Sequence, residues 1–188
     1  LLAHPEVKPK IKVISWMGGA AVGGNMSTTA EFNAYVDPHA AEIVFRSGVP
    51  IVMSGLDVTH KAYITREEMA KLRTLGTPFA EKAADMMKFY TFTQSQTPFY
   101  APNFEEQIRV HDVCAVAAIV APELFKGDNY YVEIELEGRY TTGTTIVDYT
   151  HKTGKKPNAK VLHSVNREGY IKLFFDACTT IGQQLLEE

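Results

Sequence analysis

Hydrophobic residues in the first third of the chain form two short runs separated by an amphipathic stretch. The runs "KIKVISWMGG" (residues 10–19) and "PIVMSGLDVT" (residues 50–59) are mostly apolar, which is typical of buried parallel strands. Residues 38–47 between them have helical spacing, with Asp37 as N-cap and Pro38 in the first helical position. A strand, a helix and a strand in this order form a right-handed βαβ unit. We therefore predict two parallel strands in one sheet, and an α/β fold.

The remaining pattern adds further helices and one antiparallel hairpin. Capping and spacing predict helices over residues 65–76 and from Pro78 to about Gln94, and a buried helix from His111 to before Pro122. A last helix closes the chain, and one of its faces carries Ile171, Phe174, Cys178, Ile181 and Leu185. Apolar residues alternate with glutamates in residues 130–150, which predicts a half-exposed hairpin, and residues 151–160 form a predicted exposed loop. No repeat or linker interrupts residues 1–188, so we expect a single domain.

Composition limits the classes of partner. The 188 residues are 45% hydrophobic with a net charge of −3, and the pI of about 6.1 gives no basic footprint for nucleic acid or an anionic membrane. No apolar run approaches the ~20 residues of a membrane span, and no signal peptide opens the chain, so we expect a soluble cytoplasmic protein with a small ligand. Cys114 and Cys178 lack metal-ligand spacing and are predicted to be buried thiols.

The first candidate site lies in a long predicted loop, residues 18–36, after the first strand. Ligands of open α/β sheets bind at the carboxyl ends of strands, and unstructured connections longer than about 12 to 15 residues are uncommon. Glu31 and Asn33 are two positions apart, so an extended segment would place them on one face. With Asn25 and four glycines, they offer hydrogen-bonding groups for a polyhydroxyl compound. The alternative is that the two asparagines stabilise turns and that Glu31 is solvated.

The second candidate site is the pair His111 and Asp112. An Asp suits a hard metal ion and a His titrates near neutrality. The alternative is that Asp112 is a helix N-cap beside a surface histidine. One carboxylate cannot hold Ca²⁺, which takes about 6 to 8 oxygens. In residues 88–104, Tyr90 and Tyr100 could stack on a planar ring or simply pack in the core.

Three stretches together resemble the inosine-uridine preferring nucleoside hydrolase family. They are "WMGGAAVGGNMSTTAEFNAYVDPHAAEIVFRSGVPIVMSGLDVTHKA", "VHDVCAVAAIVAPELF" and "VEIELEGRYTTGTTIVD", with AEFN, VDP and HD in the family's order. The resemblance implies a Rossmann-like, open and mostly parallel sheet with helices on both faces and an antiparallel hairpin. It also implies that the protein uses Ca²⁺ and water to cleave the N-glycosidic bond of purine or pyrimidine ribonucleosides, and that it forms a homodimer or homotetramer.

The resemblance also implies roles for individual residues. Asn25, Glu31 and Asn33 would bind the ribose hydroxyls, Asp112 would be a Ca²⁺ ligand, and His111 would donate a proton to the base. The base-contacting segment would include Tyr90, Thr91, Gln94, Phe99 and Tyr100. This assignment is chemically consistent, because an oxocarbenium-like transition state gains from oriented hydroxyls and nearby negative charge, and because the departing base needs a proton.

The chain departs from the family pattern in several places. Val113 replaces the Pro usual after HD, and Thr142 replaces an Arg in a "TRG" motif. The Asp-rich "DTDPGxDDA" motif, which carries most of the metal carboxylates and the general base, and the "LTNLA" segment are missing, so the resemblance covers only the C-terminal part of the family and lacks its N-terminal strands. We expect residues 1–188 alone to bind Ca²⁺ poorly, to hydrolyse nucleosides slowly or not at all, and to expose apolar strand edges.

Three hypotheses follow from this comparison. The first is that these residues belong to a nucleoside hydrolase whose N-terminal part is absent here. The second is that they form a non-catalytic protein that binds a nucleoside or ribose, or that interacts with another subunit. The third is that they are a bare structural remnant. The Leu at position 1, in place of an initiating Met, favours the first hypothesis.

Overall fold

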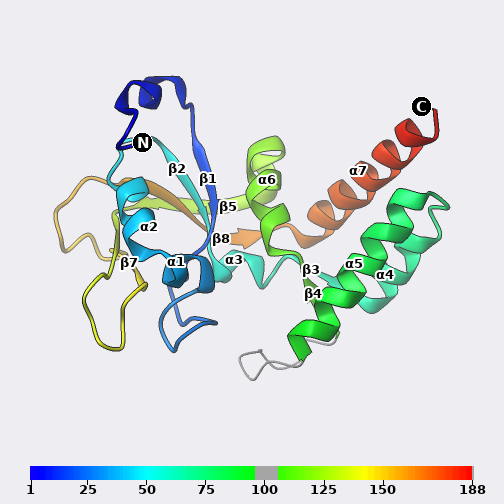
Figure 1. Ribbon diagram of the computed structural model, residues 1–188, viewed down its shortest axis with the longest axis horizontal. Helices are drawn as coiled ribbons and strands as arrows, with labels where there is room; N and C mark the ends of the chain where they lie inside the picture. Colours follow the sequence, from blue (N-terminus) through cyan, green and yellow to red (C-terminus); the bar gives the residue numbers. More distant parts are fainter. Residues whose placement is uncertain (96–105, 188) are drawn as a thin grey trace. The chain divides into compact units, whose positions relative to one another are not determined.

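The computed structural model describes residues 1–95 and 106–187, and the chain divides into two compact units (Figure 1). The sheet unit comprises Leu1–His60 and His111–Val165, and the helical unit comprises Lys61–Val110 and Asn166–Glu188. The expectation of a single domain over residues 1–188 stays a prediction. No helix in the described part of the chain is long and apolar enough to cross a membrane.

A four-stranded, mostly parallel sheet forms the centre of the sheet unit. Its strands, in spatial order, are β1 (Ile14–Met17), β2 (Ile51–Ser54), β8 (Ala159–Val165) and β5 (Phe125–Tyr130). The first three are parallel and β5 is antiparallel to β8. The predicted βαβ unit is therefore confirmed, and β1 lies at an edge of the sheet that the described strands form. The sequence pattern assigned no strand to β5 or β8.

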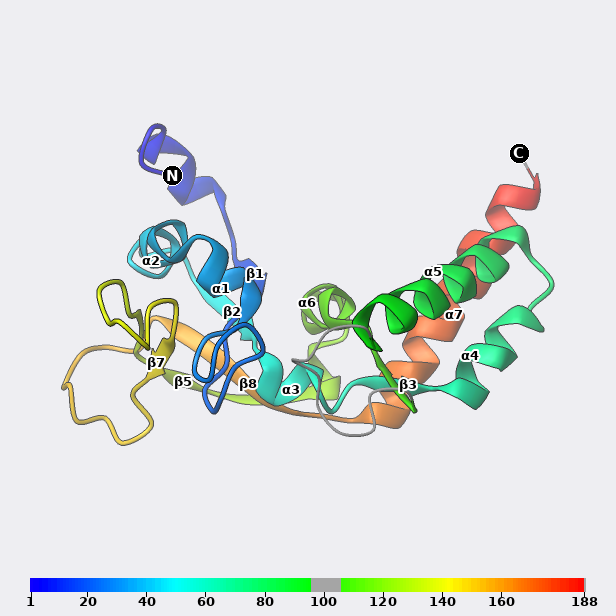
Figure 2. The same cartoon turned by 60° about the horizontal axis from the view of Figure 1, so that its bottom comes forward.

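Helices cover both faces of this sheet (Figure 2). The short elements of the unit are η1 (Pro5–Lys10), α1 (Phe32–Val36), α2 (Pro38–Phe45), α3 (Leu56–Thr59), α6 (His111–Val120) and η2 (Pro122–Leu124). Asp37 caps α2 as predicted, because its Oδ1 accepts the backbone N–H of Ala40 at 2.9 Å. On one face, Phe45 of α2 meets Trp16 edge-on, with 5.1 Å between ring centroids. On the other face, Ser15 donates to a carbonyl of α6 at 2.6 Å.

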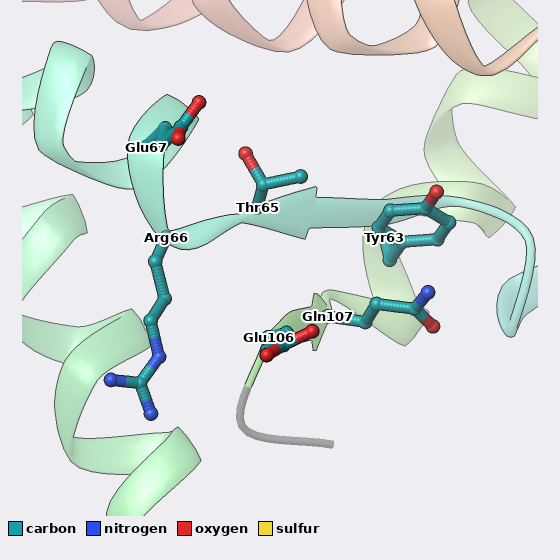
Figure 3. A pocket seen from close by; sticks show the side chains of 6 residues that line it. All are labelled: Tyr63, Thr65, Arg66, Glu67, Glu106 and Gln107. Atoms are coloured by element: carbon teal, nitrogen blue, oxygen red, sulfur yellow. The ribbon is translucent and has the colours of Figure 1, made fainter. Parts of the chain in front are cut away.

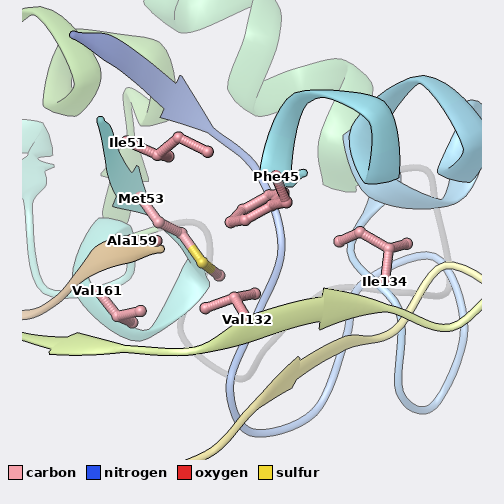
Figure 4. Close-up of a cluster of buried hydrophobic side chains, with 7 residues drawn as sticks. All are labelled: Phe45, Ile51, Met53, Val132, Ile134, Ala159 and Val161. Atoms are coloured by element: carbon pink, nitrogen blue, oxygen red, sulfur yellow. The ribbon is translucent and has the colours of Figure 1, made fainter. Parts of the chain in front are cut away.

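The core of the sheet unit lies between the sheet, α2 and the predicted hairpin (Figure 4). It consists of Phe45, Ile51, Met53, Val132, Ile134, Ala159 and Val161. The hairpin strands β6 (Val132–Ile134) and β7 (Thr145–Val147) pair antiparallel, as predicted. Burying these side chains contributes roughly 25 cal/mol for each Å² of apolar surface removed from water, which fixes the sheet against α2.

In its described residues, the helical unit has one small antiparallel sheet and three helices. These are β3 (Tyr63–Thr65), α4 (Arg66–Arg73), α5 (Pro78–Ser95), β4 (Gln107–Arg109) and α7 (Arg167–Glu187). The predicted capping box of α4 is present, with Thr65 and Glu68 each accepting the other's backbone N–H. Cys114, in the sheet unit, and Cys178, on α7, are buried thiols as predicted.

Two predicted helical faces are less buried than their patterns indicated. On α7, Ile171 and Cys178 are buried, but Ile181 and Leu185 are exposed. On α6, only the face with Cys114, Ala117 and Ala118 is buried, whereas Val116, Ile119 and Val120 are exposed. The prediction of a buried helix is therefore correct for one face of α6, which packs against β1 and β2, and wrong for the other.

Candidate active site

Glu31 is a buried carboxylate that anchors the segment following β1. Its side chain belongs to a residue only 2% exposed, and its Oε2 accepts the backbone N–H groups of Gly19 at 2.8 Å and Ala34 at 3.2 Å. Burial raises the pKa of this carboxyl above its ordinary value, against the opposing effect of the backbone N–H groups around it. The alternative that Glu31 is solvated is therefore wrong.

The segment around Glu31 is not the extended loop that the sequence pattern indicated. Glu31 is the N-cap of α1, because its carboxylate satisfies the N–H of Ala34 in the first turn. Asn33 is consequently helical, and the argument that both side chains share one face of an extended strand is wrong. Even so, Asn33 is exposed and its Nδ2 donates to the carbonyl O and the Sδ of Met17, each at 3.2 Å. It therefore lies at the carboxyl end of β1, where a ligand was expected.

Asn25 stabilises the turn that leads into α1. Its Oδ1 accepts the backbone N–H of Phe32 at 2.8 Å. Within the same turn the carbonyl of Ala30 accepts three backbone N–H groups, those of residues 25–27. This turn role is the alternative considered for Asn25 in the sequence, and any role toward a ligand stays a prediction.

The glycines of this segment allow close packing within the chain itself. A Cβ built on Gly24 would lie 2.4 Å from the carbonyl O of Ala30, and one built on Gly19 would lie 2.5 Å from Thr145 Cγ2. Gly19 also has a φ of +69°, a conformation that favours glycine. Thr145 is buried and bonds through its hydroxyl to both the N–H and the carbonyl of Ala20. The space in front of these two glycines is thus already filled by protein.

The short helix α3 connects this segment to His111, and the sequence analysis missed it. The backbone N–H of Leu56 donates to the carbonyl of Gly19 at 3.0 Å, and Asp57 Oδ2 accepts the N–H of Ala21 at 2.7 Å. At the other end of α3, Thr59 Oγ1 is 2.8 Å from His111 Nδ1.

Residues 50–59 were predicted as one strand, but the strand ends at Ser54. The signal that could have identified Asp57 and Thr59 is their place beyond the carboxyl end of that strand.

Asp112 lies in the first turn of α6 and is exposed, so the alternative that it is an N-cap is wrong. A carboxylate in a first helical turn is favourable because the helix amino end carries partial positive charge. No group of three or more His, Cys, Asp and Glu side chains that could hold a metal ion occurs among the described residues. Since Ca²⁺ takes about 6 to 8 oxygen ligands, these residues alone do not fit a Ca²⁺ ion.

The predicted base-contacting residues belong to a different part of the chain. Tyr90 is half-buried on α5 of the helical unit, and Gln94 is in the last turn of the same helix. Tyr100 and Phe99 lie outside the described residues. Their roles stay predictions.

A cavity in the helical unit is lined by none of the predicted site residues among the described ones (Figure 3). It has a volume of about 360 Å³ and is lined by Tyr63, Thr65, Arg66, Glu67, Glu106 and Gln107. The side chain of Arg66 points away from those of Thr65 and Glu67. The lining of the cavity combines positively and negatively charged side chains with an aromatic ring, and it favours no one class of ligand.

Comparison with known proteins identifies relatives over almost the whole chain. The chain is 44% identical over 176 residues to the pyrimidine-specific ribonucleoside hydrolase RihA of Escherichia coli strain K12, a match covering 94% of this chain and 55% of that protein. The chain therefore spans only about half the length of this relative.

Solved structures agree with this relationship. The purine-preferring ribonucleoside hydrolase from Gardnerella vaginalis has a TM-score of 0.84 at 34% identity, covering 97% of this chain and 56% of that one. The plant nucleoside hydrolase PpNRh1 also has a TM-score of 0.84, at 27% identity, covering 95% of this chain and 57% of that one. Residues 1–172 match the family described as inosine-uridine preferring nucleoside hydrolase. The α/β fold and the similar proteins agree, and the chain belongs to the inosine-uridine preferring nucleoside hydrolase family.

Proposed function

We propose that this chain is the C-terminal part of a ribonucleoside hydrolase, which uses water to split a purine or pyrimidine ribonucleoside into base and ribose. The observation that carries the proposal is the α3 connection, which ties the segment of Glu31 to His111 at the carboxyl ends of adjacent strands. Ligands of open α/β sheets bind at this edge. The Escherichia coli relative, at 44% identity, is a pyrimidine-specific ribonucleoside hydrolase.

Glu31 and Asn33 are the proposed ribose ligands. The hydrogen bonds from Gly19 and Ala34 both use Oε2 of Glu31, and Oε1 is the proposed acceptor of a ribose hydroxyl. Asn33 is exposed and its amide can exchange its contacts with Met17 for a hydroxyl. A negative charge beside the sugar also stabilises an oxocarbenium-like transition state, because positive charge develops on the ring as the glycosidic bond breaks. Asn25 would act with them at the same turn.

His111 is the proposed proton donor to the departing base. A base leaves more easily once a ring nitrogen is protonated, and a histidine titrates close to neutral pH. Tyr90, Gln94 and Tyr100 are the proposed contacts of the base, on α5 and the segment that follows it. Asp112 is the proposed metal ligand, and a Ca²⁺ site would need further oxygen ligands from elsewhere in the protein. A cytoplasmic location and a dimer or tetramer are part of the same proposal.

Joining this chain to the part of its relative that it lacks tests the proposal directly. The part of Escherichia coli RihA that this chain does not match would be fused before residue 1, and base release from uridine, cytidine and inosine would be measured with Ca²⁺. We expect release by the fusion and little or none by residues 1–188 alone. A fusion carrying His111→Gln is the control, and it should lose activity while folding normally. A folded fusion that releases no base from any of the three nucleosides would contradict the proposal.

The second candidate is a non-catalytic protein that binds a nucleoside or ribose, or that interacts with another subunit. It is favoured by the edge position of β1 and by the exposed apolar residues Val116, Ile119 and Val120 of the adjacent helix α6. This candidate predicts that the folded fusion binds a nucleoside, seen by calorimetry, but releases no base.

A further inference from the structure

We propose that Thr59 is a positioning residue that fixes the imidazole ring of His111, so that His111 passes its proton to the leaving base through Nε2. The inference deepens the proposed function and rests on it, since it takes His111 as the proton donor. Thr59 matches none of the residues that sequence patterns or family resemblance singled out. Only the contact with His111 in the structure identifies Thr59 as a candidate.

The contact between the two side chains is short and is built on a fixed support. Thr59 Oγ1 lies 2.8 Å from His111 Nδ1, and Thr59 is fully buried at 0% exposure. The backbone N–H of Thr59 donates to the carbonyl of Gly55 at 3.1 Å, and α3 is held at its start by the bond from Leu56 to Gly19. The backbone of Thr59 is therefore fixed by α3, and the burial of its side chain limits rotation of the hydroxyl away from His111.

A second ring restricts His111 from another direction. His60, directly after α3, meets the His111 ring edge-on, with 5.8 Å between ring centroids and 62° between ring planes. A hydrogen bond at Nδ1 sets the direction of the His111 ring, and the edge-on contact with His60 limits rotation of that ring about its bond to Cβ. Thr59 and His60 are adjacent in sequence, so one short helix supplies both restraints.

A threonine hydroxyl suits this task because it can accept the Nδ1–H of the ring. The ring keeps this Nδ1–H and its hydrogen bond to Thr59 Oγ1 both before and after Nε2 gives up its proton. The ring can therefore keep one orientation while Nε2 gives its proton to a base nitrogen. That step breaks the Nε2–H bond and forms an N–H bond on the base. The electron pair of the cleaved glycosidic bond stays with the base, and water supplies the new oxygen on the sugar.

Nitrogen NMR of ¹⁵N-histidine-labelled protein tests the ring position without any enzyme assay. Spectra of residues 1–188 would be recorded at a pH of about 8, where most histidines are neutral. We expect His111, assigned through His111→Gln, to show one dominant tautomer with the proton on Nδ1, where Thr59 accepts it. The exposed His39 should show the mixture of a solvated ring.

Substitutions at Thr59 make the NMR test specific. Thr59→Val keeps the shape and removes the hydroxyl, so His111 should shift toward the His39 pattern, and Thr59→Ser should restore the single tautomer. Thr179→Val is the matched control, because Thr179 donates to the carbonyl of Phe175 on α7, in the helical unit. A wild-type His111 that already matches His39 would overturn the proposal, even if the valine variant did not fold. An unchanged His111 in Thr59→Val would overturn it as well.

Kinetics of the fusion protein separate this inference from the proposed function. Thr59→Val should lower kcat by about tenfold to a hundredfold with little change in KM, because misorientation affects proton transfer more than binding. Thr59→Ser should recover most of kcat, and Thr179→Val should change neither constant. An ordered His111 in a fusion without activity would contradict the proposed function and leave the ring position supported. An active fusion in which Thr59→Val leaves kcat unchanged would contradict only the role of Thr59.

Discussion

The two carboxylates of the candidate site, Glu31 and Asp112, have opposite environments. Glu31 is buried and its Oε2 holds two backbone N–H groups, whereas Asp112 is exposed in the first turn of α6. A buried carboxylate with structural partners cannot be removed without loosening the fold, but an exposed one can. Loss of activity after a substitution can therefore reflect a loosened fold at Glu31, but not at Asp112.

Removing the Glu31 side chain should have the largest effect on stability. Glu31→Ala leaves the buried N–H groups of Gly19 and Ala34 without their acceptor, and each such group costs about 1 to 3 kcal/mol. We expect the free energy of unfolding to fall by about 3 kcal/mol, measured by urea denaturation followed by circular dichroism. Asp112→Ala is the matched control. A loss below about 1 kcal/mol would show that the segment does not depend on Glu31.

The bond between Asp57 and Ala21 should have the next largest effect. Asp57→Ala removes a partly buried charged acceptor, so the free energy of unfolding should fall by about 1.5 kcal/mol. Hydrogen exchange should show faster exchange of the Ala21 N–H in particular. Asp128→Ala, which removes an exposed partner of His163, is the control. Unchanged protection at Ala21 would count against α3 as the connecting element.

The pH dependence of stability should separate the charge of Glu31 from its hydrogen bonds. Because burial raises the pKa of Glu31 in the folded protein above its ordinary value of 4.5, the folded state binds more protons than the unfolded state in that pH range. The stabilising contribution is complete below pH 4.5 and is lost as the pH rises through the folded pKa.

Glu31→Gln should remove this decline. The free energy of unfolding of the wild type should therefore fall relative to that of Glu31→Gln as the pH rises from 4.5. Urea denaturation at a series of pH values measures it. A gap that is constant with pH would mean that the folded and unfolded pKa values of Glu31 do not differ.

The smallest effect on stability is expected at Asp112. Asp112→Asn should change the free energy of unfolding by less than about 0.5 kcal/mol, because the side chain is exposed. In the fusion protein, the same change should raise the Ca²⁺ concentration for half-maximal activity by about tenfold or more, since even indirect partners of a metal contribute that much. Glu31→Gln provides the contrast, because Glu31 is not a proposed metal ligand. An unaltered Ca²⁺ requirement would remove Asp112 from the proposed metal site.

Local sequence patterns predicted the elements whose ends are set by neighbouring residues. Asp37 and Pro38 begin α2, and Thr65 and Glu68 form the capping box of α4, because caps act within one helical turn. The same logic failed for α1, since a Glu as N-cap is less usual than Ser, Thr, Asp or Asn. It also failed for β8, whose place between β2 and β5 depends on strands far away in sequence.

The candidate site divides in the same way. The sequence by itself determined the family, through AEFN, VDP and HD, and it selected Asn25, Glu31, Asn33, His111 and Asp112. Only the tertiary structure decided that Glu31 is buried against Gly19, and that Thr59 meets His111 although they are 52 positions apart. Periodicity and capping report on residues within a few positions of each other. Contacts between strand ends instead depend on how the sheet and its helices pack, which no short stretch of sequence contains.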